Sequence, residues 1–172
     1  MPGRVPILPI LAAGLLTGPA MSQAPTDLPA VDYLRVEKAA RRLELWQGVP
    51  GEGGHRVRVI EGIQLGDAPV GPKRFEGDER TPEGRYVIDW GNPRSAYNLS
   101  LHISYPNAED RAYARAQGRS AGGMIMIHGQ PNDRAGGRVP GDWTDGCIAV
   151  SNAEIEFLWQ VVGDGTPIEI VP

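Results

Sequence analysis

Hydrophobic and polar residues alternate with a period of two along most of the chain from residue 31 onward, and this pattern is typical of β-strands. Two such runs, at 33–37 and 42–46, flank the polar segment 38–41 and predict a hairpin. Further strands are predicted at 56–60, 85–90, 98–105 and 166–171. Because these runs are short and Gly and Pro separate them, we expect a mostly β domain.

Helical patterns occur in only two segments, 107–117 and 152–162, which end at Gly118 and Gly163. The second segment begins with Ser151, and Glu154 follows three residues later, which is the pattern of a capping box. The chain contains no internal repeat and no linker long enough to divide it. We therefore expect one mainly β domain with two short helices.

The first 24 residues have the pattern of a signal peptide. An apolar run at 5–16 is too short to span a bilayer and is followed by small residues around 18–24. The segment has no cysteine that could carry a lipid. We predict a signal peptide at 1–24 and an exported, periplasmic protein. The alternative is that Met21 is the true start, which would leave a cytoplasmic protein.

Composition narrows the classes of function. The chain of 172 residues contains 23 Gly and 16 Pro, which disfavours a helical bundle, and its 41% hydrophobic residues fit a globular domain. A net charge of −4 disfavours nucleic acid as a partner. Cys147 is the single cysteine, so no internal disulfide can form, and only His55, His102 and His128 could serve as histidine ligands or bases.

The candidate chemistry lies between residues 124 and 152. An apolar run at 124–127 predicts a buried strand that ends at His128. Cys147 follows a Gly turn and precedes the capped helix, so nearby backbone N–H groups could lower the thiol pKa and stabilise an oxyanion. His128 could deprotonate this thiol while a backbone carbonyl holds its other ring nitrogen.

Each of these residues also has a structural interpretation. Cys147 and His128, taken singly, could be buried core residues. His102 lies on an alternating strand and fits a packed or hydrogen-bonded role as well as a supporting role at the site, whereas His55 lies in a Gly-rich turn and should be solvated. Trp143 could line a cleft or pack in the core.

Two other classes of function remain open from the residues alone. His102, His128 and Cys147 could be the three protein ligands of a catalytic zinc ion. A non-catalytic wall-binding module is the other alternative. It would use the basic stripe that Arg111, Arg115 and Arg119 are predicted to form on the first helix, although such a stripe is usually a solvated face.

The sequence His128-Gly129, followed after a loop by Thr144-Asp145-Gly146-Cys147, resembles the signature of the L,D-transpeptidase catalytic domain family, in which His-Gly precedes Ser/Thr-x-Gly-Cys. The hairpin at 36–45, a Thr81-Pro82-Glu83-Gly84 turn and the order of elements are also similar to this family. The resemblance covers residues 31–171 and predicts a catalytic domain at 31–172.

The resemblance implies a β-sandwich fold that acts on peptidoglycan stem peptides outside the cytoplasm. Cys147 would attack the carbonyl of an L-centred linkage next to a D-amino acid and form a thioester. His128 would be the general base, and the Gly129 carbonyl would orient it. The N–H groups of Asp145, Gly146 and Cys147 would form the oxyanion hole.

The resemblance also bears on partners and cofactors. His102, Trp143 and Thr144 are the candidates for supporting the site or contacting the substrate. No cofactor or metal ion is implied, and we expect a monomer. An amine from a second stem peptide would complete a transpeptidation, and water would complete a hydrolysis.

Two positions depart from the common pattern of the family. Ala149 stands where many members have Arg, and Asp145 stands where many have His, and both changes reduce positive charge beside the nucleophile. They resemble a divergent branch, some of whose members hydrolyse the bond between murein and an attached lipoprotein. We predict a transpeptidase, with a hydrolase of the same fold as the alternative.

Overall fold

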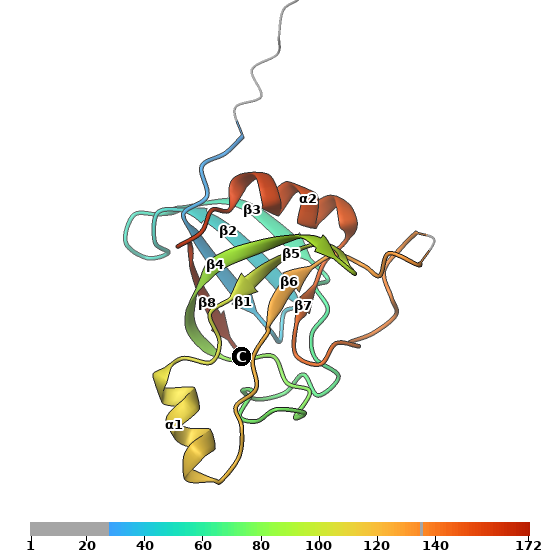
Figure 1. Cartoon of the computed structure of the whole chain (residues 1–172). Coiled ribbons are helices and arrows are strands. Elements are labelled where there is room, and N and C mark those ends of the chain that lie inside the picture. Colours follow the sequence, from blue (N-terminus) through green and yellow to red (C-terminus); the bar gives the residue numbers. More distant parts are fainter. Residues whose placement is uncertain (1–27, 135) are drawn as a thin grey trace, which may run out of the picture.

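The computed structural model describes residues 28–134 and 136–172 (Figure 1). The predicted signal peptide lies outside this range. The strands are β1 (Tyr33–Glu37), β2 (Arg42–Gln47), β3 (His55–Glu61), β4 (Gly84–Ser95), β5 (Asn98–Ile103), β6 (Met126–His128), β7 (Ile148–Ala149) and β8 (Pro167–Val171), and the helices are α1 (Ala108–Ala116) and α2 (Asn152–Val161).

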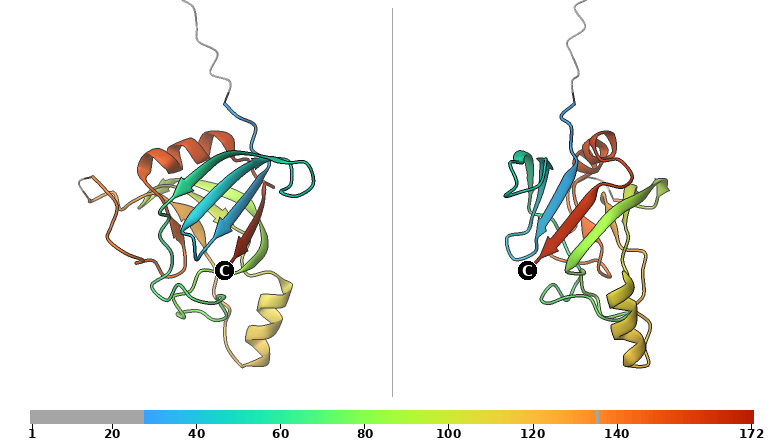
Figure 2. Two further views of the ribbon diagram at one scale, coloured as in Figure 1. Left: turned by 180° about the vertical axis from the view of Figure 1, so that it is seen from behind. Right: turned by 90° about the vertical axis from the view of Figure 1, so that its left-hand side faces the viewer.

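The strands form one eight-stranded sheet in the order β3-β2-β1-β8-β4-β5-β6-β7. β1 pairs with β8 and β6 pairs with β7 in parallel, and the other pairs are antiparallel. The long strand β4 pairs with β8 on one side and with β5 on the other. The sheet therefore continues through β4, and its two halves lie one behind the other (Figures 1 and 2).

A single cluster of buried apolar side chains lies between the two halves. It includes Leu34 and Val36 of β1, Ile127 of β6, and Ile155 and Leu158 of α2. The predicted mainly β fold with two short helices is confirmed, and the two layers of the expected sandwich are halves of one continuous sheet. Within the described ranges, no helix is long and apolar enough to cross a membrane.

Most of the elements predicted from the pattern are present. The predicted first hairpin is present, with Glu37 opposite Arg42. Both helices begin at a capping box, formed by Asn107 with Asp110 and by Ser151 with Glu154. His55, predicted in a turn, is the exposed first residue of β3.

Three local predictions are wrong. The strand predicted at 124–127 begins only at Met126, because Met124 has a φ of 57° and is 65% exposed. Residues 81–83 form no turn, since the tight turn of this loop lies at 76–77. The stripe of three arginines on one helix does not exist, because α1 ends at Ala116 and the Arg119 guanidinium instead lies 3.9 Å from the Phe75 ring centroid.

Candidate active site

The register of β6 and β7 brings the predicted nucleophile and base together. Ile127 lies opposite Ile148, so the residues that precede them, Met126 and Cys147, are also neighbours. The Met126 N–H donates a hydrogen bond to the Cys147 Sγ over 3.4 Å. Cys147 and His128 both line a pocket of about 450 Å³ on the outer face of β5 and β6. The two predicted site residues therefore line the same pocket.

His128 is held in one orientation. Its Nδ1 donates a hydrogen bond of 2.7 Å to the carbonyl oxygen of Gly129, which leaves Nε2 as the proton acceptor in the neutral imidazole. The rings of Tyr97 and Trp143 lie against the imidazole, with centroids 4.6 and 5.7 Å away. Burial lowers the pKa of His128, and the hydrogen bond to Gly129 opposes this only in part. The imidazole is therefore neutral near neutral pH, with its Nε2 unprotonated.

The pKa of the Cys147 thiol is raised, whereas the sequence pattern predicts that nearby backbone N–H groups lower it. Burial raises the pKa of its thiol, and the Asp145 carboxylate raises it further, against the opposing effects of the Met126 N–H and the Lys73 ammonium. The expectation that a helix N-terminus lowers the thiol pKa of Cys147 is wrong, because β7 lies between Cys147 and the start of α2. The resting pair is therefore a neutral thiol and a neutral imidazole, and the thiol must be deprotonated as it reacts.

Thr144 fixes the turn that carries the nucleophile. Its buried hydroxyl donates to the Cys147 carbonyl oxygen over 2.7 Å and accepts the Gly146 N–H over 3.2 Å. Gly146 has a φ of 123°, and a Cβ there would lie 2.5 Å from the carbonyl oxygen of Arg80. Only glycine fits this position. Because Thr144 already takes the Gly146 N–H, Asp145 and Cys147 remain as the candidate oxyanion donors.

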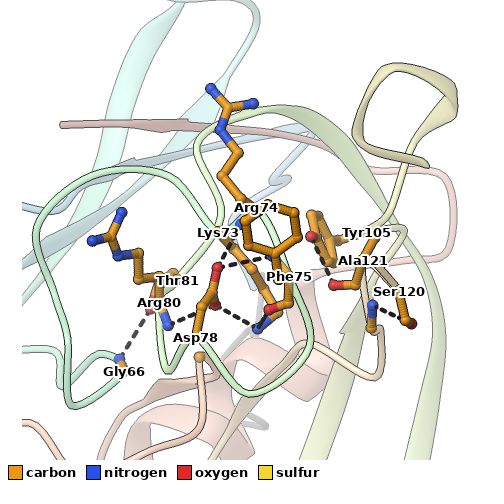
Figure 3. Close-up of polar contacts among 12 residues, drawn as sticks. Gly66, Lys73, Arg74, Phe75, Asp78, Arg80, Thr81, Tyr105, Ser120 and Ala121 are labelled. Atoms are coloured by element: carbon orange, nitrogen blue, oxygen red, sulfur yellow. Dashed lines mark hydrogen bonds and ion pairs between the residues drawn. The ribbon is translucent and has the colours of Figure 1, made fainter. Parts of the chain in front are cut away.

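The loop at 66–84 packs against this turn, because the Arg80 carbonyl lies beside Gly146. Figure 3 shows the polar contacts that hold the loop. Its centre is Asp78, whose carboxylate accepts the N–H groups of Arg74, Phe75 and Arg80 and the ammonium of Lys73. Burial alone would raise the pKa of Asp78, but these hydrogen bonds outweigh it and the pKa is lowered. The ionised carboxylate therefore holds the loop in the shape that contacts Gly146.

Of the remaining predicted site residues, Trp143 lies in the pocket and His102 lies outside it. Trp143 lines the pocket, and its ring contacts His128 and Tyr97. His102 lies outside the pocket lining, where its Nδ1 donates to Asp89 Oδ1 over 2.6 Å. Within residues 28–134 and 136–172, no group of three or more His, Cys, Asp or Glu side chains is placed to hold a metal ion, so the zinc interpretation gains no support.

Several residues of the pocket were not predicted. Ser100 lies directly opposite His128 across β5 and β6, and Tyr97 contacts the imidazole from the turn between β4 and β5. Gly123 and Met124 also line the pocket. These contacts depend on strands that pair across long sequence separations. The one available signal was the alternation at 98–105, which put Ser100 and His102 on one face.

The Gly129 position also requires glycine. A Cβ there would lie 2.6 Å from the Asn152 Oδ1 and 2.9 Å from the Tyr97 carbonyl oxygen. The same Asn152 Oδ1 accepts the Gln130 N–H over 2.8 Å and so ties the segment after His128 to the start of α2. Tight packing therefore places the carbonyl that orients the imidazole.

This fold, with a histidine and a cysteine delivered by adjacent strands, agrees with the comparison with known families. Residues 32–170 match the YkuD family, the L,D-transpeptidase catalytic domain, and the chain belongs to this family. The predicted family and fold are thereby confirmed.

Individual relatives agree with this assignment. YafK of Escherichia coli K12, whose name places it among the L,D-transpeptidases, is 28% identical over 134 residues, which are 76% of this chain and 46% of YafK. Pgp2 of Campylobacter jejuni, described as a helical cell shape determining protein, is 31% identical with a TM-score of 0.66, over 81% of this chain and 47% of Pgp2.

A third relative is Bd1075 of Bdellovibrio bacteriovorus, which is 26% identical with a TM-score of 0.56, over 83% of this chain and 48% of that protein. The chain thus spans about half the length of the relatives that it matches. What these proteins share with the chain is therefore the catalytic domain.

Proposed function

We propose that the protein is a cysteine-dependent L,D-transpeptidase that acts on peptidoglycan stem peptides through a thioester. The observation that carries this proposal is the shared pocket of Cys147 and His128, with the imidazole oriented by the Gly129 carbonyl. Membership of the L,D-transpeptidase catalytic domain family supports the same substrate class. The mechanism needs no cofactor.

In the first step, the Cys147 sulfur attacks the carbonyl carbon of the L-centred residue while the thiol proton moves to His128 Nε2. The N–H groups of Asp145 and Cys147 stabilise the developing oxyanion. The carbon–nitrogen bond to the D-amino acid then breaks, and His128 returns the proton to the departing amine. A thioester and a free D-amino acid result.

In the second step, an acceptor amine attacks the thioester carbonyl and gives its proton to His128. The carbon–sulfur bond then breaks, and His128 returns the proton to the Cys147 sulfur, which restores the thiol. An amine from a second stem peptide yields a crosslink. Water yields a hydrolysed stem by the same steps, and where the amine on the L-centred carbonyl belongs to an attached lipoprotein, that amine leaves in the first step in place of the D-amino acid. The exposed Asp145 and the buried Ala149 leave little positive charge beside the sulfur, which keeps hydrolysis as the second candidate.

The test is mass spectrometry of muropeptides with tetrapeptide stems after incubation with the purified protein. We expect loss of the terminal D-amino acid together with joined stems. Loss of the D-amino acid with no joined product would assign the hydrolase instead. Intact muropeptides at every protein concentration would refute the proposal. The Cys147→Ala variant, which removes only the sulfur, is the control.

The proposed reaction takes place outside the cytoplasm and is performed by a monomer. The apolar segment at 5–16 supports export. N-terminal sequencing of the protein recovered from the periplasm should find a start between residues 21 and 25. A cytoplasmic product that begins at Met1 or Met21 would contradict export. Sedimentation of the recovered protein should give a mass near that of one chain.

A further inference from the structure

A second cluster of side chains lies on the outer face of the sheet, beside the pocket. The pairing of β4 with β5 places Trp90 opposite His102, and the pairing of β5 with β6 places His102 opposite Met126. Met126 in turn contacts the Cys147 sulfur through its N–H. The register therefore aligns Trp90, His102 and Met126 in one row across β4, β5 and β6, and Cys147, which precedes β7, continues this row.

An irregularity in β4 creates this cluster. The register shifts between Ile88 and Trp90, so two consecutive residues, Asp89 and Trp90, are both exposed, whereas Ile88 is fully buried. Bulges of this kind redirect side chains and are common next to active sites. Without the extra residue, Asp89 and Trp90 would point to opposite faces of the sheet.

The redirected side chains hold His102 from two directions. Asp89 Oδ1 accepts the His102 Nδ1 proton over 2.6 Å, and the Trp90 ring stacks on the imidazole, with centroids 4.8 Å apart and planes 17° apart. The Trp90 residue remains 37% exposed and the Asp89 side chain 38% exposed. The result is a rigid, flat aromatic surface with a carboxylate at its edge, and the mechanism above uses none of it.

We infer that Trp90, His102 and Asp89 form a subsite that binds the sugar at the end of the donor stem peptide. This inference rests on the proposed function. The apolar face of a pyranose ring stacks on an aromatic ring, and its hydroxyl groups donate hydrogen bonds to a carboxylate. The exposed Trp90 ring and the Asp89 carboxylate supply both kinds of contact.

The spacing along the row matches the substrate. Adjacent strands lie about 4.8 Å apart, so the position of Cys147, level with β7, lies roughly 10 Å from β5 and roughly 14 Å from β4. In a tetrapeptide stem, the bond that Cys147 attacks follows the third residue, so three residues connect that carbonyl to the sugar. Extended residues span about 3.3–3.6 Å each, or roughly 10–11 Å in total. An extended stem over Met126 therefore ends near His102 on β5, and the sugar ring that follows it spans the last strand spacing of about 4.8 Å to Trp90 on β4.

The inference is tested by comparing two substrates, a disaccharide tetrapeptide and the same tetrapeptide without sugar, with the full-length protein. We expect the wild type to prefer the disaccharide form. Trp90→Ala should lower kcat/KM for that form by about 3- to 10-fold, mainly through KM, and leave the sugar-free peptide unaffected. Trp90→Phe should retain most of the preference because it keeps an aromatic face.

The matched control is Tyr113→Ala, which removes an aromatic residue of similar exposure, 44%, from α1. This variant should behave as the wild type with both substrates. Equal effects of Trp90→Ala on the two substrates, or no effect on either, would overturn the sugar subsite. Circular dichroism confirms that each variant is folded.

A binding measurement separates this inference from the proposed reaction. Saturation-transfer NMR on the Cys147→Ala variant reports which protons of the disaccharide tetrapeptide contact the protein. We expect contacts at the sugar ring that disappear when Trp90→Ala is added. If turnover is absent but these contacts are present, the subsite stands and the reaction is wrong. If turnover occurs with no sugar contact, the subsite is wrong and the reaction stands.

Discussion

Replacing Thr144 by Val tests how the nucleophile is held. Valine has nearly the same shape but lacks the hydroxyl, which donates to the Cys147 carbonyl oxygen over 2.7 Å and accepts the Gly146 N–H over 3.2 Å. Each hydrogen bond contributes about 1 kcal/mol, and the buried Gly146 N–H would be left without a partner. We expect the free energy of unfolding to fall by about 2 kcal/mol.

The same substitution should reduce catalysis, because the turn that aims the Cys147 sulfur loses its internal support. A displaced sulfur that raises the free energy of the transition state by about 1.4 kcal/mol lowers kcat/KM tenfold. Thermal unfolding should show a decrease in Tm of roughly 4–8 °C for a domain of this size. Muropeptide turnover, followed by mass spectrometry, gives the kinetic readout.

The matched control is Thr144→Ser, which keeps the hydroxyl and loses one buried methyl group. It should cost about 1 kcal/mol of stability and leave kcat/KM within twofold of the wild type. If the Val and Ser variants have the same kcat/KM, the hydroxyl does not position the nucleophile and the reasoning is refuted.

Three further substitutions test the electrostatics and packing around the site. Asp145→Asn removes a charge that raises the pKa of Cys147, so alkylation of the thiol and the rising limb of kcat/KM should both move to lower pH; coincident alkylation profiles would show that this charge does not act on the sulfur. Asp78→Asn removes a carboxylate whose pKa is lowered in the folded state, so its stabilising effect is complete above the ordinary carboxyl pKa of about 4 and is lost as the pH falls below it. Urea unfolding should show a deficit of about 3 kcal/mol at pH 7 that shrinks towards pH 3, and a deficit independent of pH would exclude the ionised form as the cause. Gly146→Ala places a Cβ against the Arg80 carbonyl and should abolish turnover, and full activity in this variant would contradict the described turn.

Local patterns were sufficient to predict most of the fold. Alternation defined the strands of the first hairpin to within one residue, and the cap at Ser151 defined the start of α2, because both depend on neighbours in sequence. The pattern failed where backbone conformation overrides it. Met124 adopts a positive φ and lies outside β6, although it belongs to a continuous apolar run.

The sequence named two candidate site residues but not the side chains around them. His128 and Cys147 were named from the motif that resembles the family, whereas Ser100 and Tyr97 join them only through the pairing of β5 with β6 and the turn before β5. The sign of the pKa shift of Cys147 was also beyond the sequence, because burial decides it and burial is a property of the whole fold.

The central claim is that Cys147 forms a thioester with the donor stem peptide. The most direct measurement is intact-protein mass spectrometry after rapid mixing with a tetrapeptide substrate and quenching in acid, which preserves a thioester. The account predicts a transient mass increase equal to the stem without its terminal D-amino acid, located on the proteolytic fragment that contains Cys147, and absent in Cys147→Ala. Turnover without any adduct, or turnover that persists in Cys147→Ala, would contradict the covalent mechanism.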